Sequence, residues 1–187
     1  APEGYQEKVQ AIATDIREQR YDAALEKARA LETEMSDSVI PAQLQAIALW
    51  TRGDRTAAID KLEATAESAP ENPGLAINLA RMQRVAGNPE AAVTALKPAL
   101  SANPENPQIL VEAARAHAAS GDQARTQELL EKAVAVAPGA VEPRVFLARL
   151  HLLAGRPAEA LTTIDGAPDD QQATAALLEI RARAQMA

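Results

Sequence analysis

The sequence predicts an all-α fold, a solenoid of about five helical hairpins followed by one more helix. Glycines recur at a step of 34 residues, at Gly53, Gly87, Gly121 and Gly155. Prolines keep the same step, at Pro70, Pro104 and Pro138. The composition also favours helices: 47% of the residues are hydrophobic but only 2% are aromatic, so the apolar side chains are mainly Ala, Leu, Val and Ile.

Two further series keep the same period and define the hairpin. Small residues follow each glycine by five positions, at Ala58, Ala92, Thr126 and Ala160. Aliphatic residues follow four positions later, at Leu62, Leu96, Leu130 and Ile164. Each unit therefore has two amphipathic segments of about 14 residues, separated by Gly and closed by Pro. One such hairpin cannot bury its apolar faces alone, whereas stacked copies can.

The hairpins are expected in order along a single array that occupies residues 1–187. We predict them at residues 5–38, 39–72, 73–106, 107–140 and 141–170, with 171–187 as a capping helix or the start of a sixth hairpin. The first hairpin has Gln19 and Arg20 in place of the glycine turn. In the third, Leu75, Leu79 and Met82 share one helix face. Pro98 lies inside the second helix of that hairpin, where we expect a local kink.

The junctions between hairpins carry helix stop and start signals. The tetrapeptide PENP occurs at 70–73 and again at 104–107. Its first Pro ends one helix, Asn106 caps the next, and Pro107 takes the first helical position. Gly87 suits the left-handed residue that ends a helix. The fifth hairpin is an exception, because DGAPDD follows Ile164 early and predicts a short second helix.

Composition and charge exclude several classes of function. A net charge of −7 and a pI near 4.9 argue against a nucleic-acid or anionic-membrane surface, because both need clustered cations. No run of about 18 apolar residues exists, so no membrane span is expected. With no Cys, disulfides and thiolate catalysis are excluded. Because the chain begins APEGYQEK and ends within a predicted helix, we expect a piece of a longer protein.

The sequence predicts no enzyme, and it offers no catalytic residue, metal site or cofactor site. His117 and His151 are 34 residues apart, so they occupy equivalent positions in two hairpins and are predicted to pack there. Neither GxGxxG nor GxxxxGK[ST] occurs, which removes the common phosphate-binding loops.

Taken together, these features resemble the tetratricopeptide repeat family, whose 34-residue unit has small residues near positions 8 and 20 and Pro near position 32. Position 8 holds Ile12, Ala46, Ala80, Ala114 and Ala148. Position 20 holds Ala24, Ala58, Ala92, Thr126 and Ala160. The aromatic positions of the family hold small, aliphatic or histidine residues here. The resemblance implies a right-handed superhelix and a non-catalytic scaffold that binds a protein or peptide partner in a concave groove.

The resemblance also implies which residues line that groove, because positions 2, 5, 9 and 12 of each first helix face it in the family. The expected lining residues are Arg81, Arg115, Arg149, Ile77, Arg84, Val111, Val145, Ile47 and Trp50, and Asn78 beside them adds a further polar side chain. Arginines suit the carboxylates of an acidic partner. Alternatively, they pair internally with Glu112, Glu142 or Glu179. Trp50 is either a partner anchor or a packing residue against Ile16.

Two finer expectations concern place and assembly. Phrases such as EPRVFLARLHLLAGRPAEAL resemble bacterial cell-envelope repeat lipoproteins of exopolysaccharide export (PEP-CTERM type). That resemblance implies a role in the periplasm or cell envelope. The alternative function is a structural, self-associating module. In that case Leu177, Leu178 and Ile180 of the last helix would form an exposed apolar face and a dimer contact.

Overall fold

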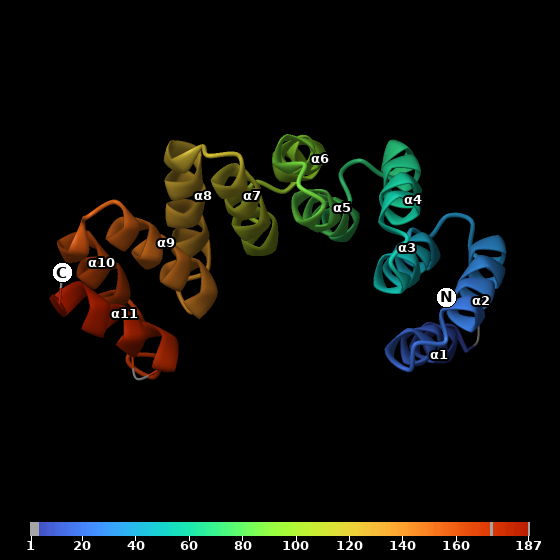
Figure 1. Cartoon of the computed structure of the whole chain (residues 1–187), viewed down its shortest axis with the longest axis horizontal. Coiled ribbons are helices and arrows are strands. Elements are labelled where there is room, and N and C mark those ends of the chain that lie inside the picture. The colour runs from blue at the N-terminus through green and yellow to red at the C-terminus, as the bar shows by residue number, and fades with distance from the viewer. Residues whose placement is uncertain (1–3, 173, 187) are drawn as a thin grey trace. The chain divides into compact units, whose positions relative to one another are not determined.

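The computed structural model describes residues 4–172 and 174–186, and within them every regular element is an α-helix (Figure 1). The helices are α1 (Tyr5–Arg17), α2 (Tyr21–Glu34), α3 (Ile40–Arg52), α4 (Arg55–Ser68), α5 (Pro73–Val85), α6 (Pro89–Ala102), α7 (Pro107–Ala119), α8 (Gln123–Val136), α9 (Val141–Leu153), α10 (Pro157–Asp165) and α11 (Ala175–Met186). The predicted all-α fold class is confirmed.

The chain divides into two compact units, Ala1–Ala99 and Leu100–Ala187. In the first unit, each of α1 to α4 packs against the next helix along the chain, and α1 also packs against α3. In the second unit the same holds from α7 to α11, and α9 also packs against α11. Each unit is therefore built from hairpins in which packing is mostly between neighbours in sequence.

The turns within the hairpins follow the glycine period. Gly53, Gly87, Gly121 and Gly155 have φ angles of 107°, 90°, 83° and 69°. Residues with a Cβ atom rarely adopt this left-handed backbone conformation, because the Cβ comes too close to the backbone. Glycine is therefore the favoured residue there. In the first hairpin Gln19 has a φ of 61°, and it is the one non-glycine residue with positive φ in the described chain. The turn geometry is thus retained where the glycine is missing.

The predicted helix caps are confirmed. The Asn72 side chain accepts a hydrogen bond from the backbone N–H of Leu75 at 3.0 Å. Asn106 accepts from the N–H groups of Gln108 and Ile109 at 3.0 and 3.2 Å. A proline directly follows each asparagine and begins α5 or α7. These caps satisfy N–H groups that have no partner within the helix.

The residues at repeat positions 8 and 20 lie at the centre of the packing. All ten have no exposed surface: Ile12, Ala24, Ala46, Ala58, Ala80, Ala92, Ala114, Thr126, Ala148 and Ala160. Small side chains at these positions let two helices approach closely, whereas longer ones would force them apart. Larger apolar residues surround them, as Leu62, Leu75 and Leu79 surround Ala46 in the first unit.

The C-terminal region confirms one expectation and overturns another. Helix α10 ends after 9 residues whereas α8 has 14, as the early DGAPDD segment predicted. The expectation of an exposed apolar face on α11 is wrong for two of its three residues. Leu177 and Ile180 are buried in a cluster with Ala148 and Ile164, and Leu178 alone of the three is exposed, at 48%. The chain itself therefore covers most of the predicted dimer contact.

Candidate interaction surface

Two of the predicted groove arginines lie in the second unit and pair with carboxylates there. Arg115 on α7 donates to Glu112 on the same helix at 3.2 Å, and it also pairs with Glu142 in the first turn of α9. Arg149 on α9 donates to Glu179 on α11 at 3.4 Å. These are the internal partners that the sequence offered as the alternative to a bound acidic segment.

The result is a strip of alternating charge across α7, α9 and α11. Arg183 on α11 completes the strip, with its guanidinium 2.7 Å from Glu179. Three arginines thus stand beside Glu112, Glu142 and Glu179, and the strip has no net basic charge. Most of these side chains are at least one-third exposed, and exposed ion pairs contribute only about 0–1 kcal/mol each. They are therefore exchangeable with the charges of a partner.

The apolar members of this predicted lining contribute unequally. Val111 on α7 is buried, so little of its side chain is available to a partner. Val145 on α9 is partly buried, and it packs against the cluster that α9, α10 and α11 share. The predicted lining in the second unit is thus mainly polar, and Val145 is the apolar side chain that it offers to a partner.

The remaining predicted lining residues lie in the first unit. Arg81 on α5 is exposed and Arg84 is half-buried, and both have interaction partners within the chain. Asn78 donates from Nδ2 to the Oε1 atom of Gln43 on α3 at 3.2 Å. Ile77 is half-buried on the same helix, beside Asn78 in sequence.

Trp50 has packing neighbours different from those expected. Ile47 and Trp50, both on α3, pack partly buried against the cluster around Leu62 and Leu75. Ile16 belongs instead to the separate cluster of α1, α2 and α3. The Arg55 guanidinium lies 5.4 Å from the centroid of the Trp50 ring, close enough for a cation–π contact. Trp50 is therefore half-buried, with one ring face occupied by a cation.

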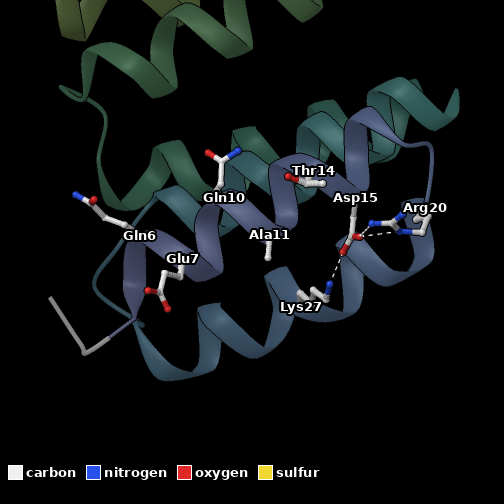
Figure 2. A pocket seen from close by; sticks show the side chains of 8 residues that line it. All are labelled: Gln6, Glu7, Gln10, Ala11, Thr14, Asp15, Arg20 and Lys27. Atoms are coloured by element: carbon white, nitrogen blue, oxygen red, sulfur yellow. Dashed lines mark hydrogen bonds and ion pairs between the residues drawn. The ribbon is translucent and has the colours of Figure 1, made fainter.

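One polar pocket was missed by the sequence analysis. It has a volume of about 620 Å³ on α1 and α2, and its lining residues are Gln6, Glu7, Gln10, Ala11, Thr14, Asp15, Arg20 and Lys27 (Figure 2). Asp15 points toward Arg20 and Lys27, with Oδ1 2.6 Å from the Arg20 Nη2 atom and Oδ2 2.6 Å from the Lys27 Nζ atom. Its side chain is only 2% exposed.

Through these ion pairs, Asp15 on α1 links its helix to α2. Hydrogen bonds from Lys27 and then from Arg20 hold the pKa of the Asp15 carboxyl below its ordinary value. Three hydrogen bonds from Arg20 and Lys27 engage both oxygens of a side chain that is 2% exposed, so Asp15 is poorly placed to act as a general base or metal ligand. The available signal was the repeat register: Asp15 occupies the same position as His117 and His151, facing the second helix of its hairpin.

We expect Asp15→Asn to lower the melting temperature by several degrees at pH 7, because the amide cannot pair with both cations. A depressed folded-state pKa contributes stability above the unfolded-state pKa, and this contribution is lost as pH falls through the folded-state value. The difference between the variant and the parent protein should therefore shrink as the pH falls below 3.8, the ordinary pKa of an aspartate. Thermal melts followed by circular dichroism would measure it. Glu7→Gln, a carboxyl of the same pocket, is the matched control, and an equal loss there would contradict the assignment.

Other candidate chemistry is sparse in the described residues. No group of three or more His, Asp and Glu residues in 4–172 and 174–186 could hold a metal ion. His151 is buried, as predicted, and burial lowers its pKa. The half-buried His117 has its Nδ1 atom 3.3 Å from an Asp122 oxygen. No helix in this part of the chain has the length and apolar character needed to cross a bilayer.

Comparisons with known proteins agree with this architecture. Family models described as tetratricopeptide repeat match residues 117–184, and residues 44–107 and 77–125. Together the matches extend from residue 44 to residue 184, which is most of the chain. No curated protein sequence matches significantly.

Solved structures give the same fold. TTC0263, a thermophilic repeat protein of Thermus thermophilus, is 23% identical with a TM-score of 0.66, and the match covers 97% of each chain. MamA from residue 41 to its end, from Desulfovibrio magneticus RS-1, is 14% identical with a TM-score of 0.69, over 88% of this chain and 93% of that one. A repeat protein of Parabacteroides merdae has a TM-score of 0.68 at 14% identity, over 99% of this chain and 72% of that one. Identities this low are informative about the fold alone.

Proposed function

The chain belongs to the tetratricopeptide repeat family, and from that premise we propose that it is a non-catalytic scaffold that binds a segment of a partner protein along the first helices of its hairpins. Proteins of this family generally act as protein-interaction scaffolds. We also propose that residues 1–187 form one repeat array, with the hairpin boundaries expected from the sequence. The observation that carries the proposal is the strip of alternating charge on α7, α9 and α11, whose ion pairs can be exchanged for those of a partner.

The row of ion pairs defines the partner's chemistry more closely than the arginines alone. A partner carboxylate that approaches Arg149 competes with Glu179, which already pairs with it. A purely acidic segment would also meet the charges of Glu142 and Glu179 at close range. A segment of mixed charge satisfies both signs, because its carboxylates pair with the arginines and its cations with the glutamates. We therefore propose a partner segment with acidic and basic residues, in contact with Val145 through an apolar side chain.

A charge inversion tests this surface without removing its internal pairs. In the triple variant Arg149→Glu, Glu179→Arg and Arg183→Glu, every pair between these residues is retained with opposite sign. We expect this variant to fold and melt like the parent protein but to lose partner capture. Capture from a lysate of the source organism, with mass spectrometry, would measure the loss. Retained capture would show that these residues serve folding and not recognition.

The control for that experiment is the single change Arg149→Glu. It places two carboxylates opposite each other on α9 and α11, so it should lose capture and also a few degrees of melting temperature. Sedimentation at two protein concentrations addresses the self-association alternative. A monomer at both concentrations would count against a dimer through α11.

We further propose that the scaffold works in an assembly of the bacterial cell envelope, of the kind that exports exopolysaccharide. The support is the resemblance of residues 142–161, EPRVFLARLHLLAGRPAEAL, to envelope repeat lipoproteins. Fractionation of the source organism, followed by detection with an antibody, would test it. We expect the signal in the periplasmic or envelope fraction, and a signal confined to the cytoplasm would contradict the proposal.

A further inference from the structure

A cleft of about 530 Å³ lies between α4 and α6 in the first unit, apart from the exposed first-helix side chains discussed above. Its lining is mainly apolar, with Leu79 from α5 below and Ala66 and Ala95 from α4 and α6 beside it. Three exposed carboxylates, Glu63, Glu67 and Glu90, also belong to its lining and form an acidic rim. Glu63 accepts a hydrogen bond from the neutral Gln83 amide at 2.7 Å. Within the described residues, no cation pairs with any of the three rim carboxylates.

The repeat supplies an internal comparison, because a cleft of about 520 Å³ between α2 and α4 includes the repeat equivalents of Ala66, Pro70, Ala95 and Pro98, namely Glu32, Ser36, Lys61 and Ala64. There, Lys61 extends from α4 toward α2, and its Nζ atom lies 2.7 and 3.0 Å from the two carboxylate oxygens of Glu32. The Gln45 amide donates to the same carboxylate at 2.7 Å. The chain itself therefore places a lysine in the lining of the first cleft, where Glu32 neutralises its charge.

The two residues of this ion pair in the first cleft are apolar at the equivalent positions 34 residues later. The equivalent of Lys61 is Ala95, and the equivalent of Glu32 is Ala66. The three rim carboxylates also have no acidic equivalent one repeat earlier, where the same positions hold Arg29, Thr33 and Thr56. The cleft between α4 and α6 thus has no lysine in its lining, and its three charged lining residues are all acidic, whereas Glu32, Asp37 and Lys61 line the first cleft.

We propose that this cleft binds a basic segment of a partner protein, with a Lys or Arg side chain in the place that Lys61 takes in the first cleft. The aliphatic stem of such a side chain would lie over Ala66 and Ala95, and its charged end would remain at the rim among Glu63, Glu67 and Glu90. Long cationic side chains prefer this geometry, because the stem is buried while the charge keeps water and carboxylates around it. The net charge of −7 also favours encounter with a basic partner.

The test uses the full chain and a labelled probe, a short peptide in which lysines alternate with leucine and alanine. Two further peptides have glutamine or glutamate in place of every lysine. Fluorescence polarisation should give saturable binding of the lysine peptide, weakened by added salt. We expect affinity at least about tenfold lower for the glutamine peptide and no binding of the glutamate peptide, since each charge pair adds little but several act together. Equal binding of the glutamine peptide, or no binding of the lysine peptide, would overturn the proposal.

Variants of the protein locate the binding. Ala95→Lys places a cation of the chain itself beside the rim carboxylates, as Lys61 lies beside Glu32 in the first cleft, and we expect it to weaken binding of the lysine peptide about tenfold. The pair Glu67→Lys and Glu90→Lys changes only exposed rim residues, so it tests the site even if Ala95→Lys does not fold, and the expected loss is again about tenfold or more. The pair Glu26→Lys and Glu105→Lys makes the same total charge change at exposed positions outside the cleft and should alter the affinity less than about twofold. If the rim pair leaves the affinity unchanged, the peptide binds elsewhere and the proposal fails.

Discussion

Leu62→Ala should lower the free energy of unfolding by about 3 kcal/mol, within the range of about 2–5 kcal/mol for leucines of this kind. Leu62 on α4 has no exposed surface, and it belongs to the cluster that joins α3, α4 and α5. Truncation removes apolar contacts and leaves a cavity that the surrounding helices fill only in part. Urea denaturation at pH 7 would measure the loss, and amide hydrogen exchange should locate it mainly in α3, α4 and α5.

The matched control is Leu153→Ala at the end of α9. Leu153 is 86% exposed, so its truncation removes little buried surface and should change the free energy of unfolding by less than about 0.5 kcal/mol. Similar effects of the two substitutions would contradict the burial described for the first unit.

Arg144→Ala is the second change with a large expected effect, about 2–4 kcal/mol of unfolding free energy. Arg144 on α9 is only 4% exposed, yet no carboxylate is among its hydrogen-bond acceptors. Its guanidinium donates to the carbonyl of Thr163 at 2.9 Å and to that of Pro138 at 3.0 Å. The Thr163 carbonyl belongs to the last turn of α10, where the helix dipole is negative and favours a cation. Alanine would leave both carbonyls without this donor and a cavity beside them.

Arg144→Met separates the hydrogen-bond contribution from the packing contribution, because it restores apolar volume without restoring the donors. We expect it to lower the free energy of unfolding, but by less than Arg144→Ala does. Arg149→Ala, on the same helix but half-exposed, should cost less than about 1 kcal/mol in the same urea experiment. If Arg144→Ala costs no more than Arg149→Ala, the buried guanidinium does not stabilise the end of α10.

The parts of the fold that could be predicted from the sequence are those that local chemistry determines. Asn106 caps α7 because an asparagine directly before a helical proline has few other good conformations, and Gly87 adopts the left-handed turn that favours glycine. Alanines such as Ala80 and Ala114 are buried at every repeat because a 34-residue period places them at the same helix crossing each time. A position that recurs in several hairpins can be predicted even where one hairpin departs from the pattern.

The features that could not be predicted depend on contacts made once, at a distance along the chain. Arg144 occupies a position that is Ala42, Ala76 or Leu110 in the three preceding hairpins and the exposed Lys8 in the first, so the pattern gave no reason to expect a buried cation. Because the fifth hairpin is short, the 34-residue register does not continue into α11. The repeat pattern therefore could not indicate which face of α11 is buried. Leu177 was therefore expected on the wrong side of its helix.

The candidate interaction surface was predictable only in part, because its residues have alternatives of similar energy. Arg149 could pair with Glu179 or remain available to a partner, and exposed ion pairs differ too little in free energy for the sequence to decide. Asp15 has its two cations five and twelve positions further along the chain, and a helical pattern alone does not bring such residues together.

Within each compact unit, the packing of most helices against the next one along the chain has a kinetic consequence. Such contacts close short loops, so little chain entropy is lost before the first stabilising contacts form. Proteins with low contact order fold rapidly, and helical domains of this kind typically fold in about microseconds to milliseconds. Each compact unit should therefore reach its native state soon after its own helices are available, without waiting for distant segments.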